Sequence, residues 1–410
     1  MRMQHSNQIV ANRWGFPVLL IPVNWETYKK VLQFDRIPAN AYDCINAQLW
    51  LSITRHGNIV NNIQHPSFPS SSSSMPDSLE TTKLFVWEAL CALPGPDFER
   101  VLDSHFSHDC VWHTSHPINE LHGTAAIAEN FWRPLARAFP DLERRTDIFF
   151  AGDFDGRFVG GAGQWACATG HYLGEFSHDW LGIPATGEPA FIRFGEFYRV
   201  EGGLIVEARV LVDLVDLMRQ SGYDVLPPGR GLEIRPPGPQ GHDGLLLTPH
   251  DSAEAVRTHA VLQCMIDGLM NFDQADLKSM GMERFWHPQM MWYGPSGIGT
   301  SRGVTGFQRH HQAPFLHAFP DRKGAGHRAR ISEGLFVAST GWPSVQATHC
   351  GEYLGVPASN QLIEMRVMDW WRREDDLLRE NWVFIDLPHL MLQIGVDLFE
   401  RLRLQVVAGR

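Results

Sequence analysis

The sequence repeats itself, and this repeat limits most strongly how the chain can fold. Two segments begin with Trp and end with Gly at an offset of 180 residues, namely W-H-T-S-H-P-I-N-E-L-H-G from Trp112 and W-Y-G-P-S-G-I-G-T-S-R-G from Trp292. The motif A-F-P-D follows each segment at the same offset. Ordered matches at a constant offset indicate two copies of one structural unit.

A second set of matches lies further along the chain at an offset of 173 residues. L-G-I-P-A-T-G from Leu181 corresponds to L-G-V-P-A-S-N from Leu354, and Asp213 corresponds to Asp386. The smaller offset means that the first copy contains about seven extra residues, which we expect in the segment from His171 to Leu181.

The repeat and the composition of the connecting segments predict the domain boundaries. We expect one domain over 76–226 and a second over 251–405, each of ordinary size. Residues 227–250 are rich in Pro and Gly and predict an extended linker. Residues 1–75 end in a run of serines and predict a poorly structured extension. Because a helix pattern begins just after Met75, we also expect the folded protein to start near that residue.

Both copies predict helices first and strands afterwards. The expected helices cover 79–90, 98–106 and 124–138 in the first copy, and 253–270, 275–285 and 304–318 in the second. Long alternating segments follow, over 158–169, 191–200 and 205–212, and over 334–348, 362–372 and 378–385. This order predicts the α+β class, with a curved antiparallel sheet wrapped around about three helices in each domain.

Composition and charge exclude several classes of function. The formal net charge is −11, so the chain lacks the basic surface that nucleic acids and anionic membranes require. Continuous apolar stretches are too short for a membrane span. Six scattered cysteines without a C-x-x-C pair predict reduced thiols and a cytoplasmic location. The spacing of His and Cys fits no zinc motif and no phosphate-binding loop appears, so we expect neither metal nor cofactor.

The motifs together resemble those of the SnoaL-like polyketide cyclases, in the nuclear-transport-factor-2-like superfamily that includes ketosteroid isomerase. The strongest match is the final strand, which reads I-V-E-A-R-V-L-V-D-L-V-D-L-M-R-Q-S-G from Ile205 and L-R-E-N-W-V-F-I-D-L-P-H-L-M-L-Q-I-G from Leu378. The resemblance covers both copies but not the first 75 residues.

This resemblance implies a cone with a deep apolar pocket between sheet and helices, and ring closure of the aldol type without a cofactor. In the family, an Asp on the last strand and a His carry out the reaction. By motif position these residues are Asp213 and Asp386, with His349 as the cleaner match for the His and His171 as its counterpart in the first copy.

The alternation of the last strand predicts which side chains accompany each Asp. Arg209 and Leu211 share a face with Asp213, and Trp382 and Phe384 share a face with Asp386. An Asp among apolar side chains is poorly solvated, which raises its pKa toward a range useful for proton transfer. The expected pocket lining also includes Trp112, His113, Trp292 and Tyr293.

Structural roles are the alternative for the same residues. Asp213 and Asp386 each precede a helix, so either carboxylate can serve as a helix cap instead of a catalyst. His171 and His349 can equally be hydrogen-bonded structural residues.

The sequence therefore predicts a cyclase, or a related isomerase or dehydratase, for a hydrophobic carbonyl compound of polyketide type. The alternatives are a non-catalytic module for small-molecule binding or assembly and, more weakly, a hydrolase for an epoxide or ester that holds water with an Asp and an Asn or Arg. We expect the two copies to pair through their sheets as an intramolecular pseudo-dimer, and further homo-oligomers stay open.

Overall fold

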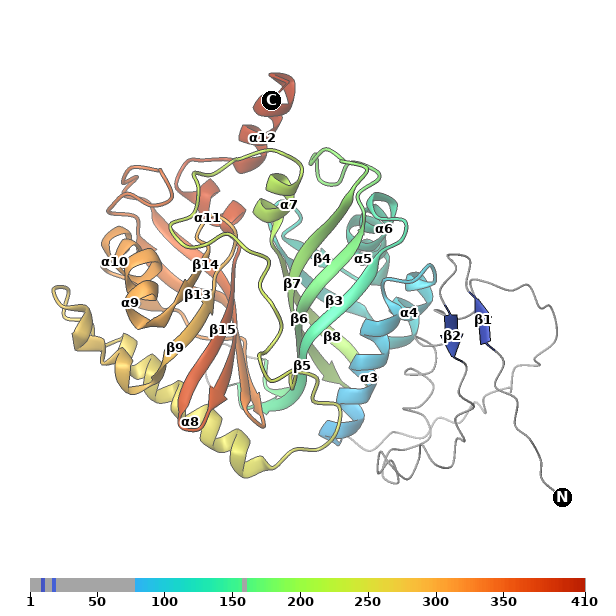
Figure 1. Ribbon diagram of the computed structural model, residues 1–410, viewed down its shortest axis with the longest axis horizontal. Helices are drawn as coiled ribbons and strands as arrows, with labels where there is room; N and C mark the ends of the chain where they lie inside the picture. The colour runs from blue at the N-terminus through green and yellow to red at the C-terminus, as the bar shows by residue number, and fades with distance from the viewer. Residues whose placement is uncertain (1–8, 12–16, 20–77, 157–160, 410) are drawn as a thin grey trace. The chain divides into compact units, whose positions relative to one another are not determined.

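The computed structural model describes residues 9–11, 17–19, 78–156 and 161–409 (Figure 1). The chain divides into two compact units, Met1–Ser72 and Ser73–Arg410. In the first unit the described residues form two antiparallel strands, β1 (Ile9–Ala11) and β2 (Pro17–Leu19). Otherwise the predicted extension over 1–75 lies outside the described residues. Within the described ranges, none of the helices has the length and apolar character that crossing a membrane requires.

The second unit contains two copies of one α+β fold, which we call repeat 1 (79–220) and repeat 2 (252–393). Repeat 1 begins with α3 (Leu79–Ala92) and α4 (Phe98–His105), and its six strands form a sheet in the order β4-β3-β8-β7-β6-β5. All neighbouring strands are antiparallel except β3 and β8, which are parallel. The remaining elements are β3 (Phe106–Thr114), β4 (Glu120–His122), α5 (Thr124–Ile127), η1 (Ala128–Trp132), α6 (Arg133–Ala138), β5 (Glu143–Phe154), β6 (Gly163–Glu175), β7 (Pro189–Glu201), β8 (Leu204–Val212) and α7 (Leu214–Gln220).

Repeat 2 has the same order of elements and the same sheet topology. It begins with α8 (Ser252–Leu269), and its strands follow the order β10-β9-β15-β14-β13-β11, with β12 also pairing with β13. The remaining elements are η2 (Leu277–Met280), η3 (Met282–Arg284), β9 (Trp286–Tyr293), β10 (Thr300–Arg302), α9 (Gly303–Phe307), η4 (Gln308–Gln312), α10 (Ala313–Ala318), β11 (Lys323–Gly324), β12 (Ala329–Glu333), β13 (Phe336–Thr348), β14 (Leu362–Glu374), β15 (Leu377–Ile385) and α11 (Leu387–Gln393). The predicted tandem α+β cones are thus confirmed.

Local sequence accounts for the boundaries of the helices. Ser78 caps α3 by accepting a hydrogen bond from the Thr81 amide at 3.2 Å, and Asp251 caps α8 through the Ala253 amide at 2.8 Å. The predicted helix over 275–285 is two short 3-10 turns instead. Gly281 lies between them in the left-handed region (φ 60°), which ends helical hydrogen bonding there.

The extra residues of the first copy lie earlier than the sequence analysis placed them. In repeat 1 the hairpin between Phe154 and Gly163 is longer than the turn between Glu333 and Phe336 in repeat 2. Strand pairing already aligns Tyr172 with Val345, which is the offset of 173. The expected insertion within 171–181 was therefore wrong, because sequence matches bracket an insertion without showing which hairpin contains it.

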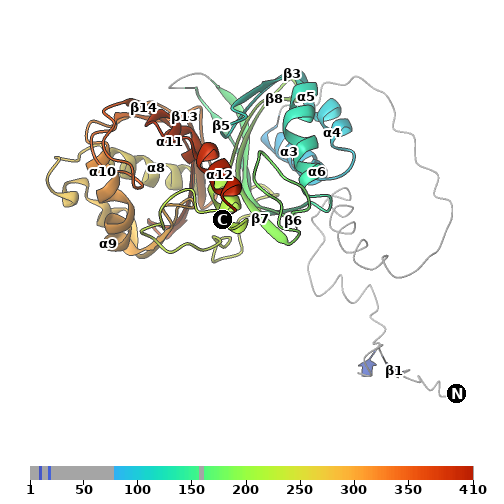
Figure 2. The ribbon, with the colours of Figure 1, turned by 90° about the horizontal axis from the view of Figure 1, so that it is seen from above.

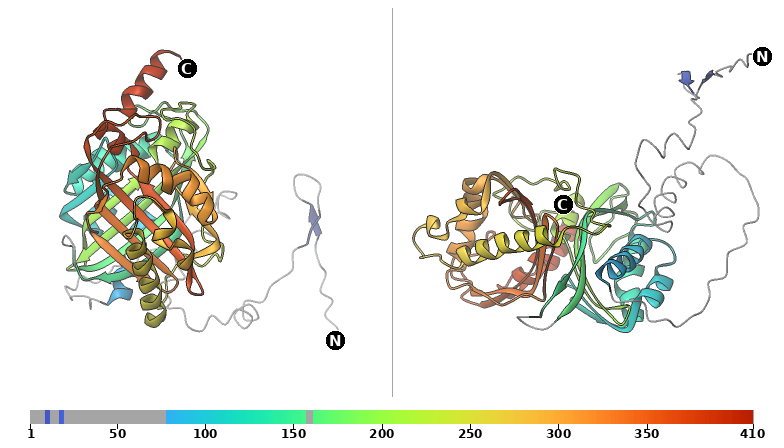
Figure 3. Two further views of the ribbon diagram at one scale, coloured as in Figure 1. Left: turned by 90° about the vertical axis from the view of Figure 1, so that its left-hand side faces the viewer. Right: turned by 90° about the horizontal axis from the view of Figure 1, so that it is seen from below.

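The two sheets pack against each other through the faces that do not carry their helices. Figure 2 shows α3 to α6 on the outside of one sheet and α8 to α10 on the outside of the other. Buried apolar side chains from both sheets form one cluster between them, including Phe150, Trp165, Phe197 and Leu211 of repeat 1 and Met368, Trp370, Trp382 and Phe384 of repeat 2. The rings of Phe197 and Trp370 lie 5.2 Å apart. The last helix, α12 (Leu398–Val407), projects beyond the ends of the sheets (Figure 3).

The predicted linker runs in an extended form along both repeats. The Leu246 amide donates to the Phe149 carbonyl at 2.9 Å in repeat 1. The Leu232 amide donates to the Thr300 carbonyl at 2.9 Å in repeat 2. These backbone bonds hold the linker against both repeats.

Gly195 tests the packing between the sheets. A Cβ at this position would lie 2.9 Å from the Trp370 ring, so we predict that Gly195→Ala lowers the free energy of unfolding by about 1–3 kcal/mol. Gly306→Ala is the control, because its Cβ would meet no atom within 4 Å and a helical alanine is favoured over glycine. Urea unfolding of both variants decides, and equal stability of the two would contradict this packing.

Candidate functional site

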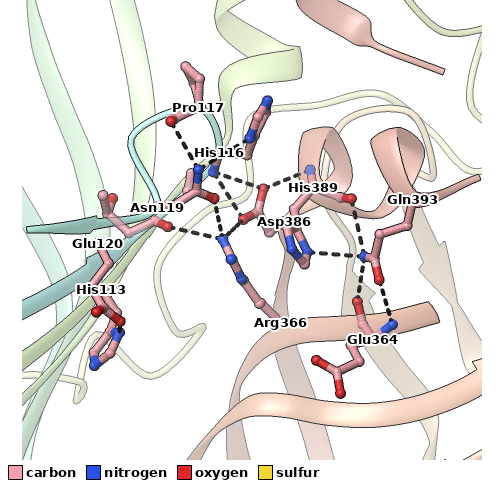
Figure 4. A network of polar contacts seen from close by, with 12 residues as sticks. His113, His116, Pro117, Asn119, Glu120, Glu364, Arg366, Asp386, His389 and Gln393 are labelled. Carbon is pink, nitrogen blue, oxygen red and sulfur yellow. Dashed lines mark hydrogen bonds and ion pairs between the residues drawn. The ribbon is translucent and has the colours of Figure 1, made fainter. Parts of the chain in front are cut away.

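Asp386 connects the two repeats. It caps α11, where its Oδ1 accepts a hydrogen bond from the His389 amide at 3.2 Å. Its Oδ2 accepts from the His116 amide of repeat 1 at 3.1 Å and from Arg366 Nη1 at 3.0 Å. Figure 4 shows the carboxylate of Asp386 between these donors, at the boundary between the repeats.

Asp213 makes the equivalent contact in the opposite direction. It caps α7 by accepting from the Asp216 amide at 3.1 Å, and it accepts from the Ser296 amide of repeat 2 at 2.8 Å. Arg193, the counterpart of Arg366, donates to the carbonyl oxygens of Gly294 and Val383, both at 3.1 Å. We call these two arrangements the Asp–Arg clamps.

Both clamp carboxylates are buried, and burial raises the pKa of each. At Asp386 the positive charge of Arg366 opposes this rise in pKa, and at Asp213 the hydrogen bond from the Ser296 amide does so. The capping contacts that the sequence offered as an alternative are thus present at both positions. A catalytic role for either Asp stays a prediction.

The two predicted histidines occupy different places in their repeats. His349 follows β13, and its Nδ1 lies 3.0 Å from Ser359 Oγ. In repeat 1 the position equivalent to His349 is Phe176, since the strands around it are aligned at the offset of 173. His171 instead lies within β6, with its Nδ1 3.5 Å from Asp147 Oδ2. The expected equivalence of His171 and His349 was therefore wrong.

The predicted pocket lining divides between two faces of the sheet. Leu211, Tyr293, Trp382 and Phe384 belong to the apolar cluster between the sheets. The next residues along β15 on the other face, Asn381, Val383 and Ile385, line a cavity. The alternation was predicted correctly, but the face assigned to the pocket was the opposite one.

The other predicted lining residues also differ in location. Trp292 lines the cavity of repeat 2, whereas Trp112 is buried in the core of repeat 1. Arg209 and His113 lie beside Trp342, with the Arg209 guanidinium 5.4 Å and the His113 ring 5.9 Å from its ring. Arg209 and His113 are therefore part of the contact between the repeats.

Repeat 2 encloses a cavity of about 250 Å³ between its sheet and its helices. The walls are mainly apolar, and their aromatic and methionine side chains are Trp286, Trp292, Phe307, Phe315, Trp371, Met265, Met270, Met282 and Met365. The few polar side chains among them are therefore candidates for chemistry. Among the described residues, no three His, Cys, Asp or Glu side chains lie together as ligands of a metal ion would.

Asp369 is the carboxylate of this cavity. It lies on β14, opposite Val383, and its Oδ1 accepts a hydrogen bond of 3.4 Å from Asn381 Nδ2. Burial raises the pKa of Asp369 to about 7, against the opposing hydrogen bond from Asn381 and the positive charge of Arg330. Asp369 keeps some accessible surface although it is half-buried, and it is one of the residues that line the cavity. At neutral pH this carboxyl group can therefore both accept and return a proton.

Two neutral imidazoles line the same cavity. His311 lies in the π-helical turn η4 and stacks on Trp292, with ring centroids 4.3 Å apart. Burial lowers the pKa of His311 to about 3. His327 lies between β11 and β12, and burial together with the charge of Arg330 lowers its pKa to about 3. Both rings are uncharged at neutral pH. The Nδ1 of His327 is hydrogen-bonded to Ser339 Oγ, whereas the Nδ1 of His311 is buried and has no hydrogen-bond partner among the described residues.

Repeat 1 has a buried ion pair in the equivalent place. Its counterpart of Asp369 is Glu196, which pairs with Arg144 at 2.6 Å and accepts a hydrogen bond from the Tyr172 hydroxyl at 2.6 Å. The Arg144 guanidinium also lies 4.2 Å above the ring of Phe194. Glu196 and Arg144 are almost completely buried. The acid of repeat 1 is thus fully occupied.

Repeat 2 lacks the arginine that pairs with the buried acid in repeat 1. The position of Arg144 is occupied by Gly324, where an added Cβ would meet no atom within 4 Å. The position of Tyr172 is occupied by Val345. These two replacements remove a guanidinium and a phenol, which leaves the cavity open and Asp369 without an ion pair among the described residues.

Sequence analysis overlooked Asp369, although a signal was present. An acidic residue stands at the same place in an otherwise apolar strand of both copies, as Glu196 and Asp369. The two copies then differ at the position whose side chain reaches this acid in repeat 1, with Arg144 in one copy and Gly324 in the other. Comparing the copies position by position would have revealed the difference.

Comparisons with known proteins agree with this fold. The model of the family SnoaL-like polyketide cyclase matches residues 97–221 and 263–394, which is more than half of the chain. The chain belongs to the SnoaL-like polyketide cyclase family. No curated protein matches it.

Several solved structures are similar to a part of this SnoaL-like chain. IdmH from Streptomyces antibioticus is 23% identical over 33% of this chain and 98% of its own, with a TM-score of 0.26. TsrD from Streptomyces laurentii is 20% identical over 33% of this chain and 96% of its own, with a TM-score of 0.27. An NTF2-like protein from Burkholderia xenovorans LB400 is 12% identical over 34% of this chain and 98% of its own, with a TM-score of 0.28.

The Asp–Arg clamps of this SnoaL-like protein predict a large effect on stability. Asp386→Ala removes the bonds to repeat 1 and leaves the guanidinium of Arg366 without its carboxylate, so we expect a loss of about 3–5 kcal/mol in the free energy of unfolding. Asp397→Ala is the matched control, because Asp397 caps α12 without an ion pair in the described residues, and its loss costs about 1 kcal/mol. Urea unfolding measures the free energy of unfolding of both variants. Equal losses in the two would contradict a stabilising contact of Asp386 with repeat 1.

Proposed function

We propose that repeat 2 is a cofactor-independent acid–base enzyme acting on a mainly apolar carbonyl compound of polyketide type. The reaction is an intramolecular aldol-type cyclisation or a related isomerisation or dehydration. The observation that carries this proposal is Asp369, a carboxyl group with a pKa near 7 that lines an apolar cavity. Family membership supports the reaction class.

The proposed chemistry uses Asp369 twice. Its ionised form removes the proton next to the substrate carbonyl, and the electron pair of the broken C–H bond forms an enolate. The enolate carbon then bonds to a second carbonyl carbon, and the resulting alkoxide takes the proton back from Asp369. The His311 imidazole stabilises the charge that develops on oxygen, because its Nδ1 is buried without a partner among the described residues and a preorganised hydrogen bond is strong in a dry cavity.

In this proposal repeat 1 is a structural partner. Its interior contains the buried Arg144–Glu196 pair, and its sheet supplies one side of the contact that buries the helix-free face of the repeat 2 sheet. The two repeats then form an intramolecular pseudo-dimer held by the Asp–Arg clamps. Asp213 and Asp386 act mainly in this contact, and the alternative of catalysis by them with His171 and His349 is tested alongside.

Hydrolysis of an epoxide or ester is the second candidate. The contact between Asp369 and Asn381 favours it, because an Asp and an Asn can together hold and activate a water molecule. Arg330 is close enough to lower the pKa of Asp369 and adds positive charge on the same side. The mass of the product distinguishes the two reactions, because hydrolysis adds one water molecule to the substrate and an aldol cyclisation leaves its mass unchanged.

Asp369→Asn tests the proposal directly. A panel of polyketones and cyclic ketones is screened with the full chain by thermal shift, and conversion is followed by mass spectrometry. We predict that Asp369→Asn lowers kcat by about 100- to 10,000-fold while ligand binding is retained. For the wild type, kcat/KM should fall as the pH drops below about 7, because the base must be ionised.

Asp213→Asn and Asp386→Asn are the comparison variants for this test. Both should retain turnover at temperatures where they are folded. Loss of turnover in one of them, with full activity in Asp369→Asn, would contradict the proposal and favour a clamp aspartate as the base. Binding without conversion in every version would favour the non-catalytic module.

Gly324→Arg tests whether the open cavity of repeat 2 is the binding site. The new side chain recreates the arginine of repeat 1 and can reach the acid of the cavity, as Arg144 reaches Glu196. We predict loss of ligand binding with stability changed by less than about 1 kcal/mol, because the position is sterically open. Gln346→Arg is the control, because it introduces the same side chain at an exposed position on the neighbouring strand outside the cavity lining, and it should bind normally. Unchanged binding in Gly324→Arg would contradict the site.

A further inference from the structure

A cation without a carboxylate partner lies at the cavity of repeat 2. Arg322 immediately precedes β11, and its Nη2 donates to the carbonyl oxygen of Leu269 at 2.8 Å. Its guanidinium also lies 5.8 Å from the ring of Phe272. These contacts hold the arginine against the end of α8, where it lines the cavity.

Arg322 contacts a backbone carbonyl at the end of α8 but no carboxylate among the described residues. None of the described carboxylates forms an ion pair with Arg322, and burial lowers its pKa with no opposing contribution. The neighbouring Asp321 is bound to the Thr348 amide at 2.8 Å and to its hydroxyl at 2.7 Å. A partly desolvated guanidinium without an anion is unfavourable, and a bound anion would offset that cost.

Asp369 lines the same cavity as Arg322. Arg330, and not Arg322, is the positive charge that acts on Asp369. The acid and the unpaired cation are therefore separate features of one cavity. A ligand can contact both only if it carries two different functional groups.

The two repeats differ at this place in the same way as they differ in their interiors. The residues equivalent to Arg322 and Lys323 are Leu142 and Glu143 in repeat 1. The open repeat thus has two cations at its cavity, and the filled repeat has an apolar residue and an acid there. The positive charge is associated with the repeat that has room for a ligand.

We infer that the ligand of repeat 2 carries a carboxylate, which Arg322 binds while the apolar body of the ligand fills the cavity. The planar guanidinium can donate two parallel hydrogen bonds to a carboxylate, and Lys323 adds a second positive charge. The inference rests on the proposed function for its site and adds the chemical class of the ligand, a keto acid instead of a neutral ketone.

A matched pair of probes tests this inference with the full chain. The probes are 6-acetyl-2-naphthoate and its methyl ester, which differ in the anionic charge and share the aromatic ketone. Calorimetric titration should show at least about tenfold tighter binding of the acid to the wild type, because hydrogen bonds to charged groups have that strength. The preference should weaken as the salt concentration rises.

Variants at Arg322 identify the residue that is responsible. Arg322→Leu, which introduces the residue of repeat 1, should remove the preference for the acid and leave affinity for the ester within about twofold. Arg322→Lys keeps the charge without the planar fork and should retain part of the preference. Lys278→Leu, an exposed position outside the cavity lining, removes the same charge and should change nothing. Thermal unfolding checks that each variant is folded.

The outcomes separate this inference from the proposed function. If the wild type binds the acid no more tightly than the ester, or if Arg322→Leu keeps the preference, the inference is wrong. Binding of the ester in either case leaves the apolar cavity standing as the binding site. If neither probe binds, the inference is wrong and the result also counts against the cavity as a site for aromatic ketones.

Discussion

The contact between the two sheets determines what every other part of the structure can do. Each sheet buries one face against the other sheet, so only the face beneath its helices remains for a ligand. The Asp–Arg clamps secure this contact in both directions, since Asp386 reaches repeat 1 and Asp213 reaches repeat 2. The last strand of each repeat therefore packs against the other repeat through one face, and its other face lies beneath the helices of its own repeat.

Within this common frame, a few replacements give the repeats different interiors. Repeat 1 pairs its buried Glu196 with Arg144 and the Tyr172 hydroxyl. Repeat 2 has Gly324 at the position of that arginine, and the pKa of Asp369 rises because burial is not offset by an ion pair. The same acidic position thus stabilises one repeat and provides a titratable group near neutral pH in the other.

Much of the fold could be predicted from the sequence, because the duplicated motifs specify the order of elements twice. The sequence did not indicate which face of the last strand lines the cavity. Trp382 and Phe384 are apolar and so are Val383 and Ile385, since a sheet covered on both sides has no polar face to mark the outside. The pairing of His171 with His349 failed because the hairpin after Phe154 contains the extra residues, which only strand register reveals.

The candidate site was less predictable than the fold for a related reason. The strand-end aspartates attracted attention because the family motif marks them, whereas an acid in mid-strand is usually read as solvent-exposed. The importance of Asp369 depends on the side chain that is missing at Gly324, from which an arginine reaches the equivalent acid in repeat 1. An absent side chain is visible only when the two copies are compared in three dimensions.

Xenon binding in crystals tests most directly whether one repeat is open and the other closed. Xenon enters apolar cavities and avoids space already filled by side chains. The account predicts a xenon site among Trp292, Phe307 and Trp371 of repeat 2, and none in the interior of repeat 1 beside Arg144. Xenon inside repeat 1, or its absence from repeat 2, would contradict the division between an open and a closed repeat.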